Sequence, residues 1–292
     1  MNSIRIGLID NSFRHHPEGT TPSKTNDYIA WNRENPLEEE LVCFTNEEIL
    51  SPQRFSIPRE KRIALLYESR DTMQWLYKNC KTIIHEYSYF FTHEKALLER
   101  FPNTYWIPGN GIWIGTKYGG ETLDFPMEKD RLVSFLTSTK KTTPAQEFRV
   151  KLAKLLGSDP KYPIDVYLRS SDAHNYIPVA TCLNRYMFSI VIENTVSPLY
   201  FTEKLLNCFA SKTIPIYLGA SETGNFFNQE GILNFKGKRD LMDVILPSIS
   251  NETYLSKLHA IEENFKRSKE FSSIEQVMSR IIQKHQNTPK FT

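Results

Sequence analysis

Apolar, often β-branched runs alternate with helix-like periodicity along most of the chain, and this pattern predicts an α/β protein. The polar stretch 12–36 has little periodicity and is predicted to be a loop. The predicted strands span 4–9, 41–44, 62–67, 82–85, 89–92, 132–136, 164–168, 187–192, 214–218 and 232–235. The predicted helices span 46–50, 72–78, 94–100, 144–156, 180–185, 240–249, 252–269 and 275–284, with another opening at Thr202. Strands separated by helices favour parallel sheets with right-handed crossovers.

The length of the chain favours two domains. Its 292 residues exceed what a single hydrophobic core usually holds. The segment 108–130 is rich in glycine and mixed in polarity, which is typical of a hinge or linker. We therefore predict an N-terminal domain over residues 1–128 and a C-terminal domain over residues 129–292.

The most informative stretch lies in the second half and predicts a strand, a polar loop, a helix and a second strand. The first strand ends at Glu193 and Asn194, and the helix opens at Thr202, Glu203 and Lys204. Threonine is a common N-cap, and an acidic residue suits a first helical turn. A lysine and an amide beside a helix N-terminus, at the carboxyl edge of a parallel sheet, would form an anion site. Taken singly, each residue also fits an ordinary strand end or a solvated helix face.

This stretch resembles the signature of the α-1,3/4-fucosyltransferases of glycosyltransferase family ten, which runs F-x-F-E-N-S, Y-x-T-E-K and V/I-P-V/I-x-x-G. Order and spacing agree, with Ile192 in place of the phenylalanine and Thr195 in place of the serine. The close resemblance covers 148–235, and the first half resembles the family only faintly. The corresponding segments here are I-E-N-T at 192–195, Y-F-T-E-K at 200–204 and I-P-I-Y-L-G at 214–219.

The resemblance implies two Rossmann-like domains facing across a cleft, the GT-B arrangement, and an inverting transfer of fucose from GDP-fucose to a glycan hydroxyl. It also implies that Arg149, on the helix 144–156, and Lys204 stabilise the leaving diphosphate. Glu203 would accept hydrogen bonds from the ribose hydroxyls. No tightly bound cofactor and no obligatory metal are predicted, because no D-x-D-like site stands out. The predicted donor-binding residues are Arg149, Glu193, Asn194, Tyr200, Thr202, Glu203 and Lys204.

A catalytic carboxylate is expected in the N-terminal domain, where the family carries a Y-x-G-E-N segment after a strand. Leu66-Tyr67-Glu68-Ser69 resembles that segment without its glycine and its asparagine. A carboxylate at the carboxyl edge of a parallel strand is well placed to act as a general base, so Glu68 is the candidate base. The alternative is an ordinary glutamate at a strand end.

The overall charge of +2 hides an asymmetry between the two halves. Residues 1–130 contain 15 Lys+Arg and 19 Asp+Glu, whereas the remainder contains 21 and 15. The basic second half suits an anionic ligand such as a nucleotide diphosphate. The acidic first half disfavours a nucleic-acid partner there.

The cysteines and the hydropathy pattern bear on the compartment. The four cysteines show no paired spacing, which favours reduced thiols over a disulfide scaffold. The N-terminal sequence lacks the apolar core of a signal peptide, and no apolar run of about 20 residues predicts a membrane span. We expect a cytoplasmic protein of bacterial or viral origin, with peripheral membrane association left open.

Three functions therefore remain in competition. The first is a fucosyltransferase acting on a glycan. The second is a transferase of the same fold that uses another nucleotide sugar or a non-glycan acceptor, such as a modified DNA base. The third is a non-catalytic nucleotide-binding protein, which the incomplete Y-x-G-E-N segment would permit.

Overall fold

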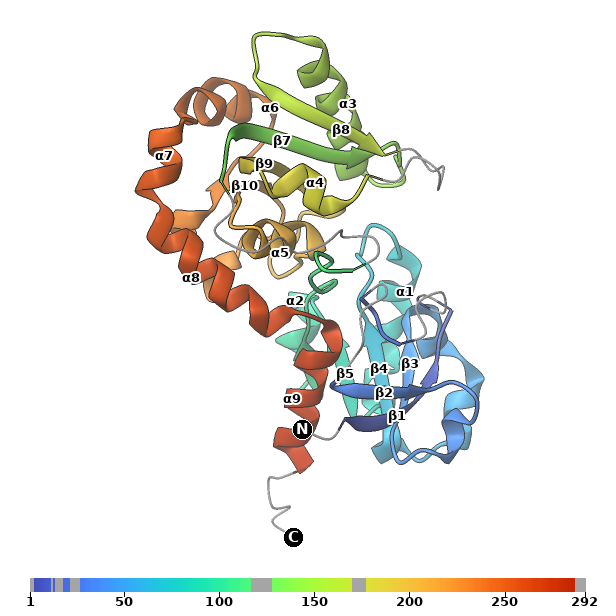
Figure 1. Ribbon diagram of the computed structural model, residues 1–292. Coiled ribbons are helices and arrows are strands. Elements are labelled where there is room, and N and C mark those ends of the chain that lie inside the picture. The colour runs from blue at the N-terminus through green and yellow to red at the C-terminus, as the bar shows by residue number, and fades with distance from the viewer. Residues whose placement is uncertain are drawn as a thin grey trace. The chain divides into compact units, whose positions relative to one another are not determined.

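The computed structural model describes residues 3–11, 13, 18–21, 27–116, 128–169 and 177–286. The chain forms two compact units, each built on its own parallel sheet (Figure 1). The first unit comprises Met1–Gly111 and Phe271–Thr292, and the second comprises Ile112–Glu270. The N-terminal stretch of the first unit thus ends at Gly111, whereas the predicted boundary is at residue 128, and the C-terminal segment belongs to the first unit.

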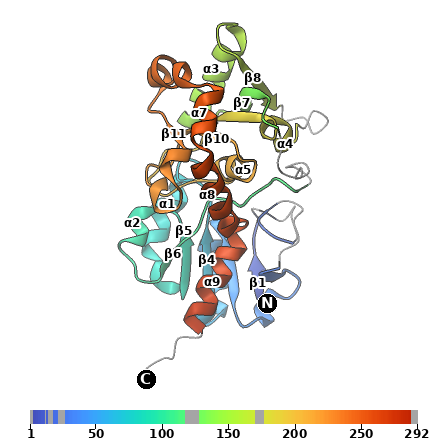
Figure 2. The ribbon, with the colours of Figure 1, turned by 60° about the vertical axis from the view of Figure 1, so that its left-hand side comes forward.

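The sheet of the first unit has the strand order β2-β1-β3-β4-β5-β6, and every neighbouring pair is parallel. Its strands are β1 (Ile4–Ile9), β2 (Ile29–Asn32), β3 (Val42–Thr45), β4 (Arg62–Leu66), β5 (Tyr89–Thr92) and β6 (Thr104–Trp106). Its α-helices are α1 (Gln74–Asn79), α2 (Lys95–Leu98) and α9 (Ile274–Gln286). Figure 2 shows α9 lying along this sheet.

Side chains that alternate along these strands build the core of the first unit. Phe44, Ala64 and Phe90 are fully buried and pack with Leu76 and Tyr77 of α1. Strands buried on both faces read as nearly continuous apolar runs, which is why the sequence made β3, β4 and β5 recognisable.

The second unit has a five-stranded parallel sheet in the order β11-β10-β9-β7-β8. Its strands are β7 (Arg131–Ser138), β8 (Ile164–Arg169), β9 (Tyr186–Ile192), β10 (Ile214–Leu218) and β11 (Leu233–Asn234). Its α-helices are α3 (Pro144–Ser158), α4 (Val179–Leu183), α5 (Glu203–Ala210), α6 (Lys238–Asp240), α7 (Asn251–Ser256) and α8 (Leu258–Ser268). In Figure 1, α3 covers one face of the sheet, and α4 and α5 cover the other.

The two sheets share one topology. In each, the second strand lies on one side of the first, and the third and later strands extend on the other side. The winding therefore reverses between β1 and β3 in the first unit and between β7 and β9 in the second. Open α/β sheets bind ligands beyond the carboxyl ends of the strands at this reversal, so the residues that follow these four strands are the candidate site residues.

The structure corrects three details of the predicted secondary structure. Strand β2 lies inside the segment 12–36, which was predicted to be a loop; it has only four residues and pairs along β1. The predicted strand 82–85 is instead part of two 3₁₀ turns, because a short apolar run alone does not distinguish the two states. The predicted helix 252–269 breaks at Lys257 into α7 and α8.

Helix α9 is held to the rest of the first unit by a buried carboxylate. Glu275, in the first turn of α9, is fully buried. Its oxygens accept hydrogen bonds from the Thr20 backbone N–H at 2.5 Å, from the Thr20 hydroxyl at 2.8 Å and from Trp31 Nε1 at 3.2 Å. These contacts join residues more than 240 positions apart in the chain and explain why the C-terminal segment belongs to this unit.

Replacing Glu275 with alanine is expected to lower the free energy of unfolding by about 2 kcal/mol or more, since it leaves buried donors without an acceptor. Urea unfolding followed by circular dichroism measures the change. The control is Glu40→Ala, which removes an exposed carboxylate from the same unit and should shift the midpoint little. Equal midpoints for the two variants would contradict the anchoring role of Glu275.

Candidate active site

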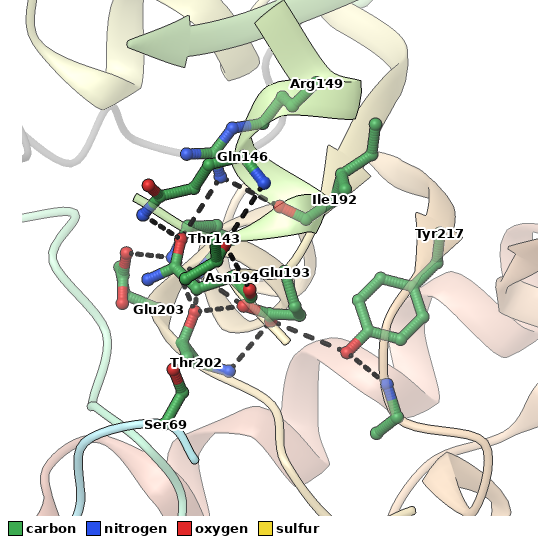
Figure 3. Close-up of polar contacts among 12 residues, drawn as sticks. Ser69, Thr143, Gln146, Arg149, Ile192, Glu193, Asn194, Thr202, Glu203 and Tyr217 are labelled. Carbon is green, nitrogen blue, oxygen red and sulfur yellow. Dashed lines mark hydrogen bonds and ion pairs between the residues drawn. The ribbon is translucent and has the colours of Figure 1, made fainter. Parts of the chain in front are cut away.

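The predicted donor-binding residues meet where the winding of the second sheet reverses. Strand β9 ends at Ile192, and Glu193 and Asn194 follow it directly. Thr143 caps the start of α3, and Thr202 caps the start of α5. Figure 3 shows these segments converging on one cluster of polar side chains.

Arg149 lies in this cluster as a buried cation with spare hydrogen-bonding capacity. Its side chain projects from α3 and is 5% exposed. Nη1 donates to the Ile192 carbonyl at 3.0 Å and weakly to Asn194 Oδ1 at 3.5 Å. The Nε group is buried, and within the described residues it has no hydrogen-bond partner. Burial lowers the pKa of Arg149, which the nearby carboxylates of Glu193 and Glu203 oppose, and a guanidinium stays charged.

The start of α3 fixes the loop that carries Asn194. The Thr143 hydroxyl accepts from the Gln146 N–H at 3.2 Å and donates to the Asn194 carbonyl at 2.7 Å. Gln146 Nε2 donates to Asn194 Oδ1 at 3.3 Å. An amide oxygen that accepts from Gln146 and Arg149 leaves the Asn194 NH₂ group as the part that can donate to a ligand.

Glu193 is the most buried residue of the cluster, and its carboxylate is bonded to Thr202. It is fully buried, and its carboxylate accepts from the Thr202 N–H at 2.9 Å and from the Thr202 hydroxyl at 2.7 Å. Tyr217 Oη lies 3.5 Å from Glu193 Oε1 and accepts from the Ala220 N–H at 3.0 Å. A Cβ atom on Gly219 would come within 2.6 Å of Glu193 Cγ, so only glycine fits there.

The hydrogen bonds around Glu193 are ones that an ionised carboxylate can accept. Thr202 directs two donors at the carboxylate, and Tyr217, whose oxygen already accepts a bond, directs its proton the same way. A carboxylate accepts all three of these bonds. Burial raises the pKa of Glu193, and the ammonium of Lys204, 3.6 Å away, works against that rise. Glu193 therefore holds the start of α5 through Thr202.

Lys204 lies between two carboxylates at the start of α5. Its Nζ is 2.9 Å from Glu203 Oε1 and 3.6 Å from Glu193 Oε2, and it donates to the Thr202 hydroxyl at 3.0 Å. Burial opposes its charge, but Glu203 and Glu193 outweigh that effect and raise the pKa of Lys204. Its side chain is still 25% exposed, so it can reach a ligand. Tyr200, also predicted to bind the donor, is 3% exposed beside this cluster.

The cluster is chemically suited to a phosphate-containing ligand. Donors come from Arg149, whose Nε–H has no partner among the described residues, from the partly exposed Lys204, from the Asn194 amide and from the N-terminus of α5. A helix N-terminus and fixed cations together favour an anion that gathers charge during a reaction.

The comparison with protein families decides what this cluster belongs to. The model of "Glycosyltransferase family 10 (fucosyltransferase) C-term" matches residues 126–290, more than half of the chain. The chain belongs to glycosyltransferase family 10. The resemblance seen in the sequence is thereby confirmed.

Characterised relatives match this family 10 protein over short segments. An α-(1,3)-fucosyltransferase, FucT of Helicobacter pylori, is 36% identical over 66 residues, which are 22% of this chain and 14% of that protein. The 3-galactosyl-N-acetylglucosaminide 4-α-L-fucosyltransferase FUT3 of Bos taurus is 30% identical over 132 residues, 43% of this chain and 35% of that protein. The chain thus matches only about a third or less of the length of these relatives.

Solved structures confirm the fold over nearly the whole chain. A crystal structure of an α1,3-fucosyltransferase with GDP-fucose matches with a TM-score of 0.56 and 15% identity, covering 99% of this chain and 92% of that one. Anabaena Alr3699/HepE with UDP-glucose matches with a TM-score of 0.59 and 11% identity, covering 97% and 92%. The family 10 chain has the GT-B fold, with two parallel-sheet α/β domains.

Glu68, the candidate base, lies in the first unit at the carboxyl end of β4, as the sequence predicted. Its side chain is half-buried. Its backbone N–H donates to Asn46 Oδ1 at 3.3 Å, and its carbonyl accepts from the Tyr77 hydroxyl at 2.6 Å.

The sequence did not reveal the supporting residues Thr143, Gln146 and Tyr217. A signal for Thr143 existed, because threonine followed by proline at 144 is a common helix start, whereas Tyr217 is an aromatic residue within a buried strand and reads as core.

Among the described residues, no group of three or more His, Cys, Asp or Glu side chains could hold a metal ion. No helix in the described ranges has both the length and the apolar character needed to cross a bilayer.

Replacing Glu193 with glutamine is expected to lower the free energy of unfolding by about 1–3 kcal/mol, because an amide cannot accept both bonds from Thr202. Urea unfolding measures this, with the exposed Glu147→Gln on α3 as the control. An unfolding midpoint identical to that of the control would mean that Glu193 is protonated or that the network does not stabilise α5.

Proposed function

We propose that this protein is an inverting glycosyltransferase that moves fucose from GDP-fucose to a hydroxyl group of a glycan. The second unit binds the donor, and the first unit binds the acceptor and supplies the base. The single observation that carries the donor site is Arg149, a buried cation beside Lys204 and the start of α5 whose Nε–H has no partner in the part of the chain that the structure describes. An unpaired buried donor costs about 1–3 kcal/mol, and a phosphate oxygen would remove that cost.

The proposed donor contacts follow from the chemistry of each side chain. Arg149 and Lys204 neutralise the diphosphate, the Asn194 amide donates to it, and the positive end of the α5 dipole adds to the attraction. The ribose hydroxyls donate hydrogen bonds to the Glu203 carboxylate. This weakens the ion pair between Glu203 and Lys204, so the Lys204 ammonium can bind a phosphate oxygen.

Transfer is a single displacement at the anomeric carbon. The acceptor oxygen forms a bond to C1 while the bond from C1 to the phosphate oxygen breaks, and the electron pair leaves with GDP. The proton of the acceptor hydroxyl passes to the Glu68 carboxylate. The second unit's cations stabilise the charge that grows on the leaving diphosphate, and one displacement inverts the configuration.

The choice of fucose rests on the family and on the α1,3-fucosyltransferase structure with GDP-fucose. The match to HepE with UDP-glucose supports another nucleotide sugar as the second candidate, since the two structures share the fold. The four cysteines are buried and unpaired, which supports a reducing compartment such as the cytoplasm.

A donor screen tests the proposal. The purified protein is incubated with GDP-fucose, GDP-mannose, UDP-glucose and UDP-galactose, with glycan or DNA acceptors, and nucleotide release is measured. Release from GDP-fucose with transfer to a glycan is expected. Turnover of only another donor, or transfer only to DNA, would replace the proposed substrates. Tight GDP binding without turnover for any pair would mean that the protein is not an enzyme.

A further inference from the structure

Asn46 has a left-handed backbone conformation, which is uncommon for residues other than glycine. Its φ is 43°, in the left-handed region, and Lys212 is the other non-glycine residue with positive φ in the described ranges. Asparagine tolerates this region better than most residues, although such a conformation still costs free energy and persists only where other contacts hold it. Asn46 directly follows β3, where the winding of the first sheet reverses.

The fully buried side chain of Asn46 reaches the segment after the neighbouring strand. Oδ1 accepts from the Tyr67 N–H at 3.2 Å and from the Glu68 N–H at 3.3 Å. Parallel pairing of β4 with β3 ends at Leu65, so the amide oxygen holds the chain where that pairing stops.

The Tyr77 side chain bonds the backbone carbonyl of Glu68. The Tyr77 hydroxyl, from α1, lies 2.6 Å from the Glu68 carbonyl and 3.0 Å from Nε2 of the buried His93. Burial lowers the pKa of His93 to about 3 and raises that of Tyr77 well above 10, so both side chains stay neutral near pH 7. Both backbone polar groups of Glu68 are therefore bonded to side chains from other elements.

We propose that Asn46 is a positioning residue that fixes Glu68 at the ligand edge of the first sheet, with Tyr77 as its counterpart. The inference rests on the proposed function, in which the Glu68 carboxylate accepts the proton of the acceptor hydroxyl. A general base works only within hydrogen-bond reach of its proton, so fixing the backbone of Glu68 affects turnover more than donor affinity. Asn46 adopts this unfavourable φ because the conformation directs Oδ1 at the N–H groups of Tyr67 and Glu68.

Asn46→Gly and Asn46→Asp separate positioning from folding. Glycine adopts positive φ without strain and removes the side chain that carries the acceptor, whereas aspartate keeps an acceptor oxygen on a side chain of the same shape. Asn46→Gly is expected to lower kcat at least tenfold, leave the KM for the donor within twofold, and speed hydrogen exchange at the amides of Tyr67 and Glu68. Asn46→Asp is expected to retain most of kcat. Lys212→Gly, at the other left-handed residue, is the matched control and should leave kcat unchanged.

The outcomes distinguish this inference from the proposed function. An inactive Glu68→Gln enzyme together with a slow Asn46→Gly enzyme supports both. Normal kcat in Asn46→Gly alongside an inactive Glu68→Gln overturns the positioning role alone. Normal transfer by Glu68→Gln shows that the base lies elsewhere, and the inference about Asn46 then falls with that assignment, while the donor assignment of the second unit is still tested by its own variants.

Discussion

Replacing Glu68 with glutamine is expected to lower kcat for transfer by at least about 100-fold, since a general base contributes about 10²–10⁴-fold to a rate. Glutamine keeps the size of the side chain but cannot accept the proton that the acceptor hydroxyl loses. Donor binding is expected to be unchanged, because the proposed donor-binding residues belong to the second unit. Initial rates with saturating donor and acceptor, together with calorimetric titration of GDP, measure the two effects.

Glu60→Gln is the control for this variant. Glu60 is exposed and belongs to the same unit, and its replacement with glutamine removes the same charge. Its kcat should match that of the unchanged protein. A Glu68→Gln enzyme as active as the Glu60→Gln enzyme would remove Glu68 from the mechanism.

Replacing Lys204 with alanine is expected to lower donor affinity or turnover at least tenfold, which corresponds to losing one charged contact of about 1.5–3 kcal/mol. Lys204 is the partly exposed cation at the start of α5, and its ammonium also balances the buried charge of Glu193. The variant therefore loses a phosphate contact and leaves a buried carboxylate without its nearest cation. GDP titration and steady-state kinetics with varied donor measure the loss.

Lys151→Ala serves as the matched control for Lys204→Ala. Lys151 lies on α3 close to Arg149 in sequence, but its side chain is 79% exposed and pairs only with Glu147 at the helix surface. Removing it should leave donor affinity unchanged, because exposed ion pairs contribute little. Equal affinities in the two lysine variants would take Lys204 out of the donor site.

The sequence predicted the second unit well because its signals are local. Strand β9, helix α5 and strand β10 follow one another within about 30 residues, and each carries an apolar run or a cap that is visible without tertiary contacts. Their order brings Glu193, Asn194 and Thr202 to one edge of the sheet by topology alone.

The roles within that cluster could not be predicted from the sequence. Glu193 is predicted to bind the donor, and the structure adds that its carboxylate is fully buried and contacts Thr202, Tyr217 and Lys204. Sequence order places a carboxylate at a strand end, but whether it faces the core or the ligand depends on packing from other strands. Gly219 illustrates this dependence, since its missing side chain makes room for Tyr217 and Glu193.

The first unit was harder to predict because its decisive contacts are long-range. Strand β2 is short, and the buried Glu275 that joins α9 to this unit contacts Thr20 and Trp31 from the other end of the chain. No periodic pattern encodes such a contact. The positive φ of Asn46 is equally invisible in the sequence, since asparagine is common after strands for many reasons.

The central claim is that the second unit binds the diphosphate of a nucleotide sugar through Arg149 and Lys204. A crystal structure of the protein with bound GDP tests it most directly. We expect phosphate oxygens within hydrogen-bond distance of Arg149, of Asn194 and of Lys204 at the start of α5. GDP bound elsewhere, or phosphates that contact neither Arg149 nor Lys204, would contradict it.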